Sequence, residues 1–235
     1  MSVTLTLDDL EALRQISTPT ICNTIEVFNV RPRSAGFFNN EIKCVFPGMG
    51  TMVGFAATAT MRAERPDYNP ETLVNRWRFW NHTVAQPTPR IAVIEDLDDP
   101  VAQGSFWGEV QGNTFKALGA IGCITNGGVR DLDEAEAMGF QFYASHVIPS
   151  HAYVHVVEVG IPVKVGGIVV RPGDLLHADK HGITTIPIEV AKDIPKAAKE
   201  IEAKERKIIS LCQSNKFSTE KLWDLLAGGK PVPPK

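Results

Sequence analysis

The chain has 235 residues, which is enough for one large domain or two small ones with a sizeable core. Hydrophobic residues make up 43% and charged residues 22%, as in an ordinary soluble globular protein. The formal net charge of -3 argues against a nucleic-acid surface, which would need a clustered basic face. We therefore expect no nucleic-acid partner.

The beginning of the chain and its cysteines indicate a cytoplasmic protein. Asp8, Asp9 and Glu11 stand where a signal peptide would need a basic and then an apolar stretch, so we expect no signal peptide. No apolar run approaches membrane-spanning length. The four cysteines lie far apart without a C-x-x-C pair, which argues against disulfide scaffolds and zinc knuckles.

The N-terminal residues 1–30 are predicted to form two helices. Thr6 can cap the first, and Thr18 followed by Pro19 is typical of an N-cap and a first-turn proline for the second. Residues 48–61 are rich in small and β-branched residues, which favours a strand. Residues 91–94 read as a short buried strand that ends in a cluster of acidic residues.

Residues 62–90 form an excursion without a clear period. The segment holds four prolines around the run NRWRFWNH. We interpret it as a helix with aromatic core contacts inside a long surface excursion. The alternative is a lid over a ligand, since long loops are often functional.

The second half of the chain is easier to interpret. We expect a helix over 108–118, a strand over 121–125, and a second helix over 132–138 that Gly139 ends. Residues 141–187 read mostly as strands. A charged helix follows from about Pro195 to Cys212, and a short helix after Ser218 is expected to end at Gly228 and Gly229. Without a repeat or a clear linker, we predict one domain over 1–235, with a C-terminal helical extension over 190–235.

The most informative motif is NGGVRD, which joins the strand over 121–125 to the next helix. Glycines at a strand-to-helix turn let backbone approach a ligand, and a helix start offers free amides. Arg130 and Asp131 would then stand at the open end of the sheet, where ligand sites gather. The structural alternative is that Asp131 and Glu134 form a capping box and that Arg130 pairs with a carboxylate.

A second helix start strengthens the functional interpretation. Residues 107–111, WGEVQ, open the helix that precedes the strand over 121–125, and its first amides form another anion site. Two helix N-termini that flank one strand would suit a small ketoacid. The amides would take its carboxylate, Asp131 would hold a divalent cation, and Arg130 would offset charge on the keto oxygen.

The histidines give weaker candidates. His151, Tyr153 and His155 are predicted to alternate on one face of a strand, which leaves a zinc role as a minor alternative. His177 and His181 read as turn and surface residues.

Together these motifs resemble the RraA-like family, which includes 4-hydroxy-4-methyl-2-oxoglutarate and 4-carboxy-4-hydroxy-2-oxoadipate aldolases. The resemblance runs from WGEV through NGGVRDLDEAEAMGF to IPVKVGGIVVRPGDLLHADKHGITTIP, and is weaker over STPTICNTIE and GTMVGFAATAT. It implies an α/β fold, a swivelling β/β/α domain whose mixed sheet forms a partly open barrel with flanking helices. It also implies homotrimers or homohexamers with sites at subunit interfaces.

The resemblance places the family's functional residues on particular positions. It assigns substrate binding to Gly108, Glu109, Val110, Gln111 and Arg130, and metal binding to Asp131. Asn126 departs from the family pattern, which usually has Asp there, and the 62–90 excursion is longer than usual. The aldolases also borrow acidic residues from a neighbouring subunit, and Glu26 is a candidate match for one of them.

The implied activity is that of a class II pyruvate aldolase, a carbon–carbon lyase that uses Mg²⁺ or Mn²⁺. It would cleave a 4-hydroxy-2-oxoacid to pyruvate and a second oxoacid, with Arg130 stabilising the enolate and Glu109 positioning or deprotonating a water. Oxaloacetate decarboxylation is expected as a side activity. The alternative is a non-catalytic regulator that binds a ribonuclease. That regulator lacks the aspartate after the arginine, whereas Asp131 is present here.

Overall fold

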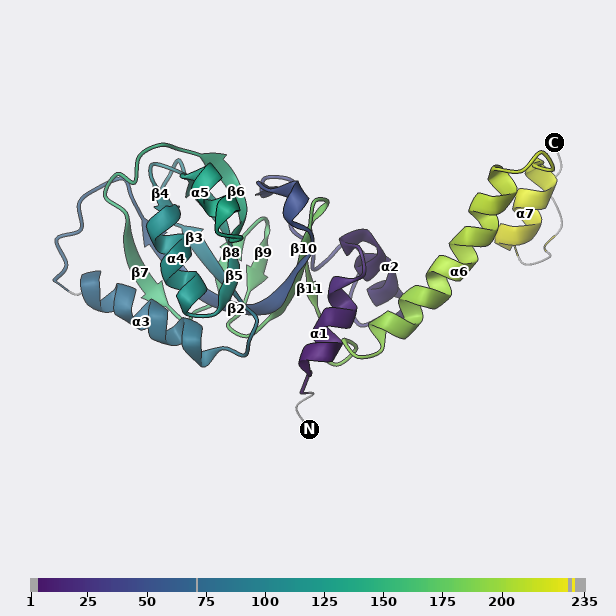
Figure 1. Cartoon of the computed structure of the whole chain (residues 1–235), viewed down its shortest axis with the longest axis horizontal. Coiled ribbons are helices and arrows are strands. Elements are labelled where there is room, and N and C mark those ends of the chain that lie inside the picture. Colours follow the sequence, from purple (N-terminus) through teal and green to yellow (C-terminus); the bar gives the residue numbers. More distant parts are fainter. Residues whose placement is uncertain (1–3, 71, 228–229, 231–235) are drawn as a thin grey trace.

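The computed structural model describes residues 4–70, 72–227 and 230. Its centre is a nine-stranded mixed sheet that is nearly closed and barrel-like, with helices around it (Figure 1). The main path runs β1-β6-β5-β3-β2-β10-β11, while β4 adds to β5 and β7 adds to β2. The predicted α/β fold with a mixed, partly open barrel is therefore confirmed.

The strands follow the predicted β-rich segments. Those of the sheet are β1 (Lys43–Cys44), β2 (Met52–Arg62), β3 (Arg90–Asp96), β4 (Ser105–Trp107), β5 (Ala120–Val129), β6 (Gln141–Val147), β7 (His155–Val159), β10 (Leu175–Asp179) and β11 (Gly182–Ile186). A separate pair consists of β8 (Val163–Val165) and β9 (Ile168–Val170). The neighbours β2, β3, β5 and β6 run parallel, and the outer pairs β1–β6, β2–β10 and β10–β11 are antiparallel.

Strand β2 shows why this sheet needs cover on both faces. Its residues 52–61 are all buried, and they are small or apolar without the alternation of a half-exposed strand. One face packs into a cluster that includes Met61, Phe79 and Phe115. The other face packs into a second cluster around Ile91 and Leu176. A continuously apolar strand of this kind is typical of a sheet covered on both sides.

Two predicted helices begin the chain, and one of the two predicted caps is correct. In α1 (Leu7–Arg14), Thr6 is the N-cap and forms a capping box with Asp9. In α2 (Thr18–Phe28), the N-cap is Ser17, so the prediction that Thr18 caps this helix is wrong. Thr18 instead connects α2 to β10, because its amide donates to the carboxylate of Asp179 at 2.9 Å.

His177 corrects a further prediction. It was expected at the surface, but its side chain lies in β10 beneath the N-terminal helices and is 0% exposed. Its ring contacts the Thr18 hydroxyl at 3.0 Å and the carbonyl of Leu13 at 3.1 Å. His177 therefore ties α1 and α2 to the sheet. Burial lowers the pKa of this imidazole, which favours its neutral form. His181 lies in the β10–β11 turn, as predicted.

The excursion over 62–90 contains α3 (Thr72–Ala85), which lies beside β7 (Figure 1). Phe79 and Thr83 are buried on the side that faces the body. The predicted helix with aromatic core contacts is therefore confirmed. Asn75 fastens the helix to β7, because its amide group donates to the backbone carbonyl of Val157 at 3.0 Å.

Short helices α4 (Glu109–Ala117) and α5 (Leu132–Ala137) contact one another, and each packs on the strand next to it in the chain. Both were predicted. Between them, β5 is longer than predicted, because it runs through Gly127 and Gly128 to Val129. The glycine pair therefore belongs to the strand and does not form the turn into α5.

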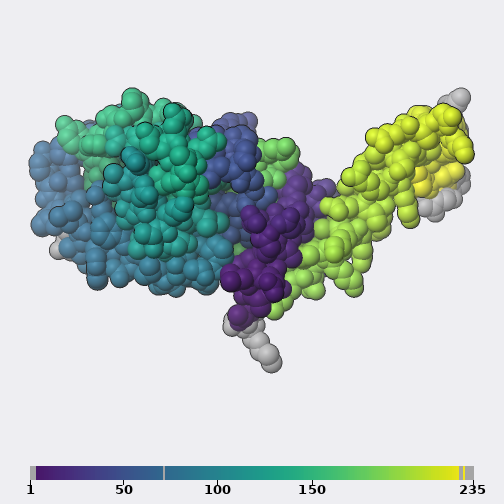
Figure 2. Space-filling model, viewed as in Figure 1, coloured from purple at the N-terminus to yellow at the C-terminus, as the bar shows by residue number. Residues whose placement is uncertain are grey.

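The chain continues into α6 (Ile194–Cys212) and α7 (Thr219–Ala227), which form an arm that stands clear of the body (Figures 1 and 2). Only the first turns of α6 are buried, at Ile194 and Ala198. The predicted end at Gly228 and Gly229 lies outside the described residues. Within the described part of the chain, no helix combines the length and apolar character needed to cross a membrane. The division of the chain into one domain with extensions stays a prediction.

Candidate active site

The turn after β5 holds Arg130 and Asp131 in a fixed position. The Arg130 amide donates to the carbonyl of Trp107 at 3.0 Å, which joins the end of β5 to the end of β4. Asp131 adopts a left-handed backbone with φ 54°, a conformation that favours Asn, Asp and Gly. Asp131 is the N-cap residue of α5, but its side chain makes no cap hydrogen bond. The capping box between Asp131 and Glu134, which was the structural alternative for this motif, is therefore absent.

The Asp131 carboxylate turns instead toward the beginning of α4. Its Oδ2 atom accepts the backbone amide of Glu109 at 2.9 Å. A Cβ atom added to Gly108 would lie 2.4 Å from this oxygen, so only glycine leaves room for the carboxylate. The Nε atom of Arg130 lies 3.8 Å from the same oxygen, and its Nη1 atom donates to the carbonyl of Pro149 at 3.4 Å. The start of α4, the Asp131 carboxylate and the Arg130 guanidinium thus lie next to one another.

These groups open into a pocket of about 510 Å³. Of the predicted site residues, it is lined by Gly108, Val110, Gln111, Arg130 and Asp131. Glu109 is exposed and its side chain is not among the lining residues, although its amide holds Asp131. The structure therefore brings five of the six predicted residues to one cavity and leaves Glu109 at its edge.

Another part of the pocket wall holds none of the predicted site residues, although a lid over a ligand was the alternative interpretation of the excursion. It comes from the excursion, through Asp67, Thr72 and Arg76, and from the segment before β7. His151 and His155 also line the pocket, but the prediction that they share one strand face is wrong, because β7 begins only at His155. The prolines and aromatic residues of the excursion signalled a surface segment, and nothing in its pattern indicated which part of the sheet it would cover.

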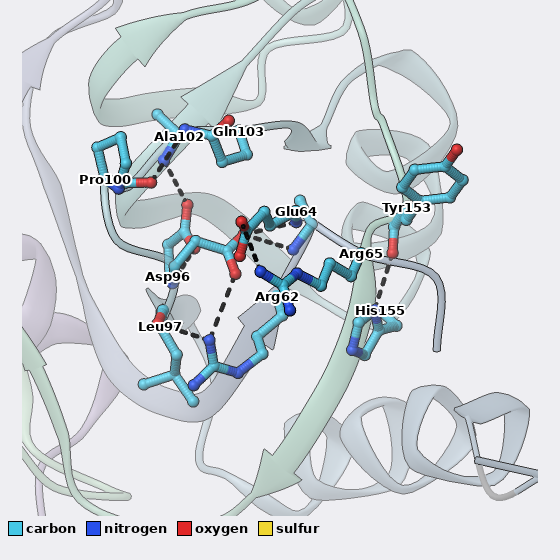
Figure 3. A network of polar contacts seen from close by, with 12 residues as sticks. Arg62, Glu64, Arg65, Asp96, Leu97, Pro100, Ala102, Gln103, Tyr153 and His155 are labelled. Atoms are coloured by element: carbon cyan, nitrogen blue, oxygen red, sulfur yellow. Dashed lines mark hydrogen bonds and ion pairs between the residues drawn. The ribbon is translucent and has the colours of Figure 1, made fainter. Parts of the chain in front are cut away.

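Both histidines have one ring nitrogen occupied by backbone. The Nδ1 atom of His155 lies 2.8 Å from the carbonyl of Tyr153 (Figure 3). The Nδ1 atom of His151 lies 2.7 Å from the carbonyl of Ala152. A carbonyl can only accept, so each Nδ1 carries the proton. In the neutral ring this leaves Nε2 as an acceptor at a ligand pocket.

An aromatic cluster supports the floor of the site. Trp107, directly before Gly108, is fully buried and packs edge-on against Phe115 of α4, with ring centroids 4.8 Å apart. Phe79 of α3 contacts the same Phe115 ring at 4.8 Å. Such pairs add to the free energy gained by burying the rings. The start of α4 and the helix of the excursion are therefore anchored to one core.

The predicted acidic cluster after β3 has a structural role. The carboxylate of Asp96 accepts the amides of Asp98 and Ala102 at 3.0 and 2.7 Å, and Asp98 accepts the amide of Ala63 at 2.6 Å (Figure 3). Burial raises the pKa of Asp96, while these backbone donors lower it. Asn126 completes the network, because its amide oxygen accepts the Asp96 amide at 2.7 Å and its nitrogen donates to the Asp96 carbonyl at 2.9 Å. The network fixes the chain where the excursion leaves β2.

The donors at the site suit a hard cation that keeps most of its water. Within the part of the chain that the structure describes, no group of three or more His, Cys, Asp or Glu side chains could hold a metal ion. Asp131 contributes a single carboxylate, with about a third of its side chain exposed to the pocket and solvent. Mg²⁺ is commonly bound by one or two carboxylates together with its substrate, so Asp131 fits this ion. Glu26 lies on α2, pairs with Arg33 at 3.2 Å and does not line the pocket.

The comparison with known proteins now identifies the family. A model described as RraA-like, aldolase/RraA, matches residues 18–185. The chain belongs to the RraA-like family. The match covers β5, the Arg130–Asp131 turn and the whole pocket wall.

Individual relatives span both kinds of function in this family. An uncharacterized protein of Methanocaldococcus jannaschii is 24% identical over 200 residues, which are 85% of this chain and 86% of that protein. A protein of Halalkalibacterium halodurans, named "Putative 4-hydroxy-4-methyl-2-oxoglutarate aldolase", is 31% identical over 98 residues, 40% of this chain and 47% of its own. A crystal structure from Streptomyces coelicolor, described as an unusual member of the RNase ES inhibitor RraA protein family, has a TM-score of 0.66 at 21% identity. It covers 86% of this chain and 96% of its own, and this likeness shows the fold.

Proposed function

We propose that this protein is a divalent-metal-dependent class II aldolase that cleaves a 4-hydroxy-2-oxoacid to pyruvate and a second oxoacid. The observation that carries the proposal is the Asp131 carboxylate, held 2.9 Å from the Glu109 amide beside Arg130 within the pocket. Family membership and the relative named as an aldolase support a lyase. Oxaloacetate decarboxylation, which passes through the same pyruvate enolate, is the proposed side activity.

In this proposal Asp131 holds Mg²⁺ or Mn²⁺, and the start of α4 over Gly108–Gln111 binds the substrate carboxylate beside the Glu109 amide, which Asp131 already engages. The cation, when bound, supplies Lewis-acid stabilisation of negative charge on the 2-oxo group. A base removes the proton of the C4 hydroxyl, the C3–C4 bond breaks, and its electrons pass into the enolate of pyruvate. Arg130 stabilises the enolate oxygen, and protonation at C3 then gives pyruvate. Glu109, at the edge of the pocket, would position or deprotonate the water that serves as the base.

A second candidate is a non-catalytic protein that binds and regulates a ribonuclease. The Streptomyces coelicolor structure, described as belonging to the RNase ES inhibitor RraA protein family, supports this candidate. The acid–arginine pair inside a cavity favours the enzyme, because a binding surface has no need of a small concave site with a partly exposed carboxylate. Assembly into trimers or hexamers and a cytoplasmic location remain parts of the proposal.

Metal removal and the variant Asp131→Asn test the proposal together. We expect a chelator to abolish pyruvate release from 4-hydroxy-2-oxoacids, and Mg²⁺ or Mn²⁺ to restore it. Asp131→Asn keeps the shape of the side chain and tolerates the left-handed backbone at φ 54°, but it removes the charge that binds the cation. It should therefore fold normally and lose Mg²⁺ binding in calorimetry.

Two results would contradict the proposed aldolase activity. Full activity in the chelated protein would exclude the metal-dependent mechanism. If the wild type cleaves no oxoacid in a screen that follows pyruvate, the ribonuclease-binding candidate takes first place, and co-sedimentation with a ribonuclease becomes the next measurement.

A further inference from the structure

Helix α3 presents one face to the pocket and to the body. Thr72, Arg76, Phe79 and Thr83 are spaced at three and four residues, so they lie along the same side of the helix. Phe79 and Thr83 are buried, and Thr72 and Arg76 line the pocket. Because Phe79 is fixed against Phe115 and Phe106, the position of Arg76 on this face is fixed as well.

Arg76 is half-buried, and it makes no hydrogen bond or ion pair with any residue that the structure describes. Among the described residues that line the pocket, the acidic residue nearest to Arg76 in sequence is Asp67, and its own loop already engages it. It accepts the Asn69 amide at 2.8 Å and the Thr72 hydroxyl, and the Thr72 contact lowers the pKa of Asp67. A guanidinium carries five donors in a rigid fork, and burying it without an acceptor is costly. The pocket therefore offers a cation that lacks an anion.

The charges of the residues that line the pocket also favour an anionic ligand. Among the described residues that line the pocket, Arg76 and Arg130 balance Asp67 and Asp131, so the formal charges of these four side chains sum to zero. A divalent cation on Asp131 would raise this to two positive charges. Arg130 adjoins Asp131, whereas Arg76 comes from α3 in the excursion, so the two arginines line the pocket from different elements. A dianion with its two charges at opposite ends is the ligand that matches this arrangement.

We propose that Arg76 determines substrate specificity by binding a second carboxylate at the end of the substrate remote from the 2-oxo group. The proposal rests on the proposed function for the orientation of the substrate, because the 2-oxoacid end is placed at Asp131 and Arg130. Guanidinium and carboxylate match in a bidentate geometry, which a neutral methyl end cannot use. The excursion thus supplies the specificity wall, and the Arg130–Asp131 turn supplies the chemistry.

Two oxoacids of equal length test this role without turnover. 2-Oxoglutarate has a carboxylate where 2-oxopentanoate has a methyl group, and neither has the 4-hydroxyl that aldol cleavage needs. Titration calorimetry with Mg²⁺ should show that the wild type binds 2-oxoglutarate at least tenfold more tightly. In Arg76→Gln we expect 2-oxoglutarate affinity to fall roughly 10- to 100-fold, the scale of a hydrogen bond to a charged group, with 2-oxopentanoate unchanged.

Arg78→Gln is the matched control, because Arg78 lies on the same helix, is exposed and is outside the pocket lining. The Arg78→Gln variant removes one positive charge from α3, as Arg76→Gln does, so it measures any long-range electrostatic effect. It should leave the affinities for both oxoacids unchanged. Arg76→Lys should retain part of the preference, and it provides a second variant if Arg76→Gln does not fold.

Three results would overturn the role of Arg76. The first is that Arg76→Gln lowers the affinity for both ligands equally. The second is that Arg78→Gln lowers the 2-oxoglutarate affinity as much as Arg76→Gln does. The third is that the wild type shows no preference between the ligands or binds neither of them. The proposed function fails separately, because a wild type that prefers 2-oxoglutarate but cleaves no 4-hydroxy-2-oxoacid would keep the Arg76 site and lose the aldolase.

Discussion

In the proposed mechanism, Arg130 stabilises a negative charge that appears during the reaction. Its guanidinium is held between the carboxylate of Asp131, at 3.8 Å, and the carbonyl of Pro149, at 3.4 Å. The Pro149 contact engages one of its donors, and the guanidinium lines the pocket. The remaining donors are free to meet an enolate oxygen, which exists only after the carbon–carbon bond has broken. Arg130 is therefore suited to the transition state more than to the resting substrate.

The variant Arg130→Lys tests the role of Arg130 in enolate stabilisation without changing the charge of the side chain. The lysine ammonium is a mobile point charge, so it cannot hold an oxygen in the geometry that the guanidinium fixes. We expect the variant to fold normally and to bind Mg²⁺, and to lose on the order of 10² to 10³ in kcat, the scale for one preorganised donor. Stopped assays of pyruvate formation would measure it.

Oxaloacetate decarboxylation provides the control for this variant. It passes through the same enolate, so it should fall in parallel with aldol cleavage. Decarboxylation that stayed intact while cleavage fell would show that Arg130 orients the aldol substrate and does not stabilise an enolate.

The sequence predicted which residues would lie near Arg130 and Asp131, but not the geometry in which they meet; their roles stay predictions. The run NGGVRD indicated that Arg130 and Asp131 act together, and they do lie together in one pocket. The pattern D-L-D-E equally favoured a capping box, because the spacing alone satisfies that motif. The structure decides between them through φ 54° at Asp131 and the contact to the Glu109 amide, both of which depend on the neighbouring helix.

At the scale of elements, the site is the junction of α4 with the end of β5. The close approach of Gly108 to Asp131 sets the distance between these elements. Gly108 has an extended backbone, with φ −169°, that any residue can adopt, so the need for glycine comes from the 2.4 Å gap between an added Cβ and the Asp131 oxygen.

Gly108→Ala is therefore expected to displace the Asp131 carboxylate while leaving the fold intact. A displacement of about 1 Å at a catalytic group lowers rates by about 10²-fold, and we expect that loss in kcat together with weaker Mg²⁺ binding. Gly48→Ala is the matched control, because an added Cβ there meets nothing within 4 Å. Equal activity of the two variants would contradict the role assigned to the junction.

Sequence periodicity predicted where most helices and strands lie. It failed where tertiary contacts determine the conformation or the burial of a residue. Gly127 and Gly128 were interpreted as a turn, yet they continue β5, where an added Cβ would meet Asp96 at 3.0 Å or Ser105 at 2.9 Å. His177 lies in a polar run that is typical of a turn, and only the packing of α1 and α2 buries it. Local pattern carries no information about which distant element will cover a residue.

At the scale of the molecule, the body and the C-terminal arm differ in how they bury apolar surface. The body has three buried clusters, whereas α7 has no buried residue. The arm stands away from the body (Figure 2). It exposes four large apolar side chains, namely Ile209, Phe217, Leu225 and Leu226. Exposed apolar surface of this kind is typical of contacts with another protein. The acidic groups at the pocket are also few, since the described residues place only Asp67 and Asp131 there.

These two features lead to the prediction that the active form is an oligomer in which a neighbour completes the site. Sedimentation velocity in the assay buffer should show a trimer or a hexamer, and dilution through its dissociation should lower the specific activity in proportion to the oligomer that remains. The dependence of specific activity on protein concentration is more informative than the number of subunits. It distinguishes an interface that forms the site from one that only stabilises the fold. Mg²⁺ should shift the equilibrium toward the oligomer if the neighbour supplies a carboxylate near Asp131. Monomers that retain full specific activity at low concentration would show that one chain contains the whole site, and Asp131 would then bind its cation with water and substrate alone.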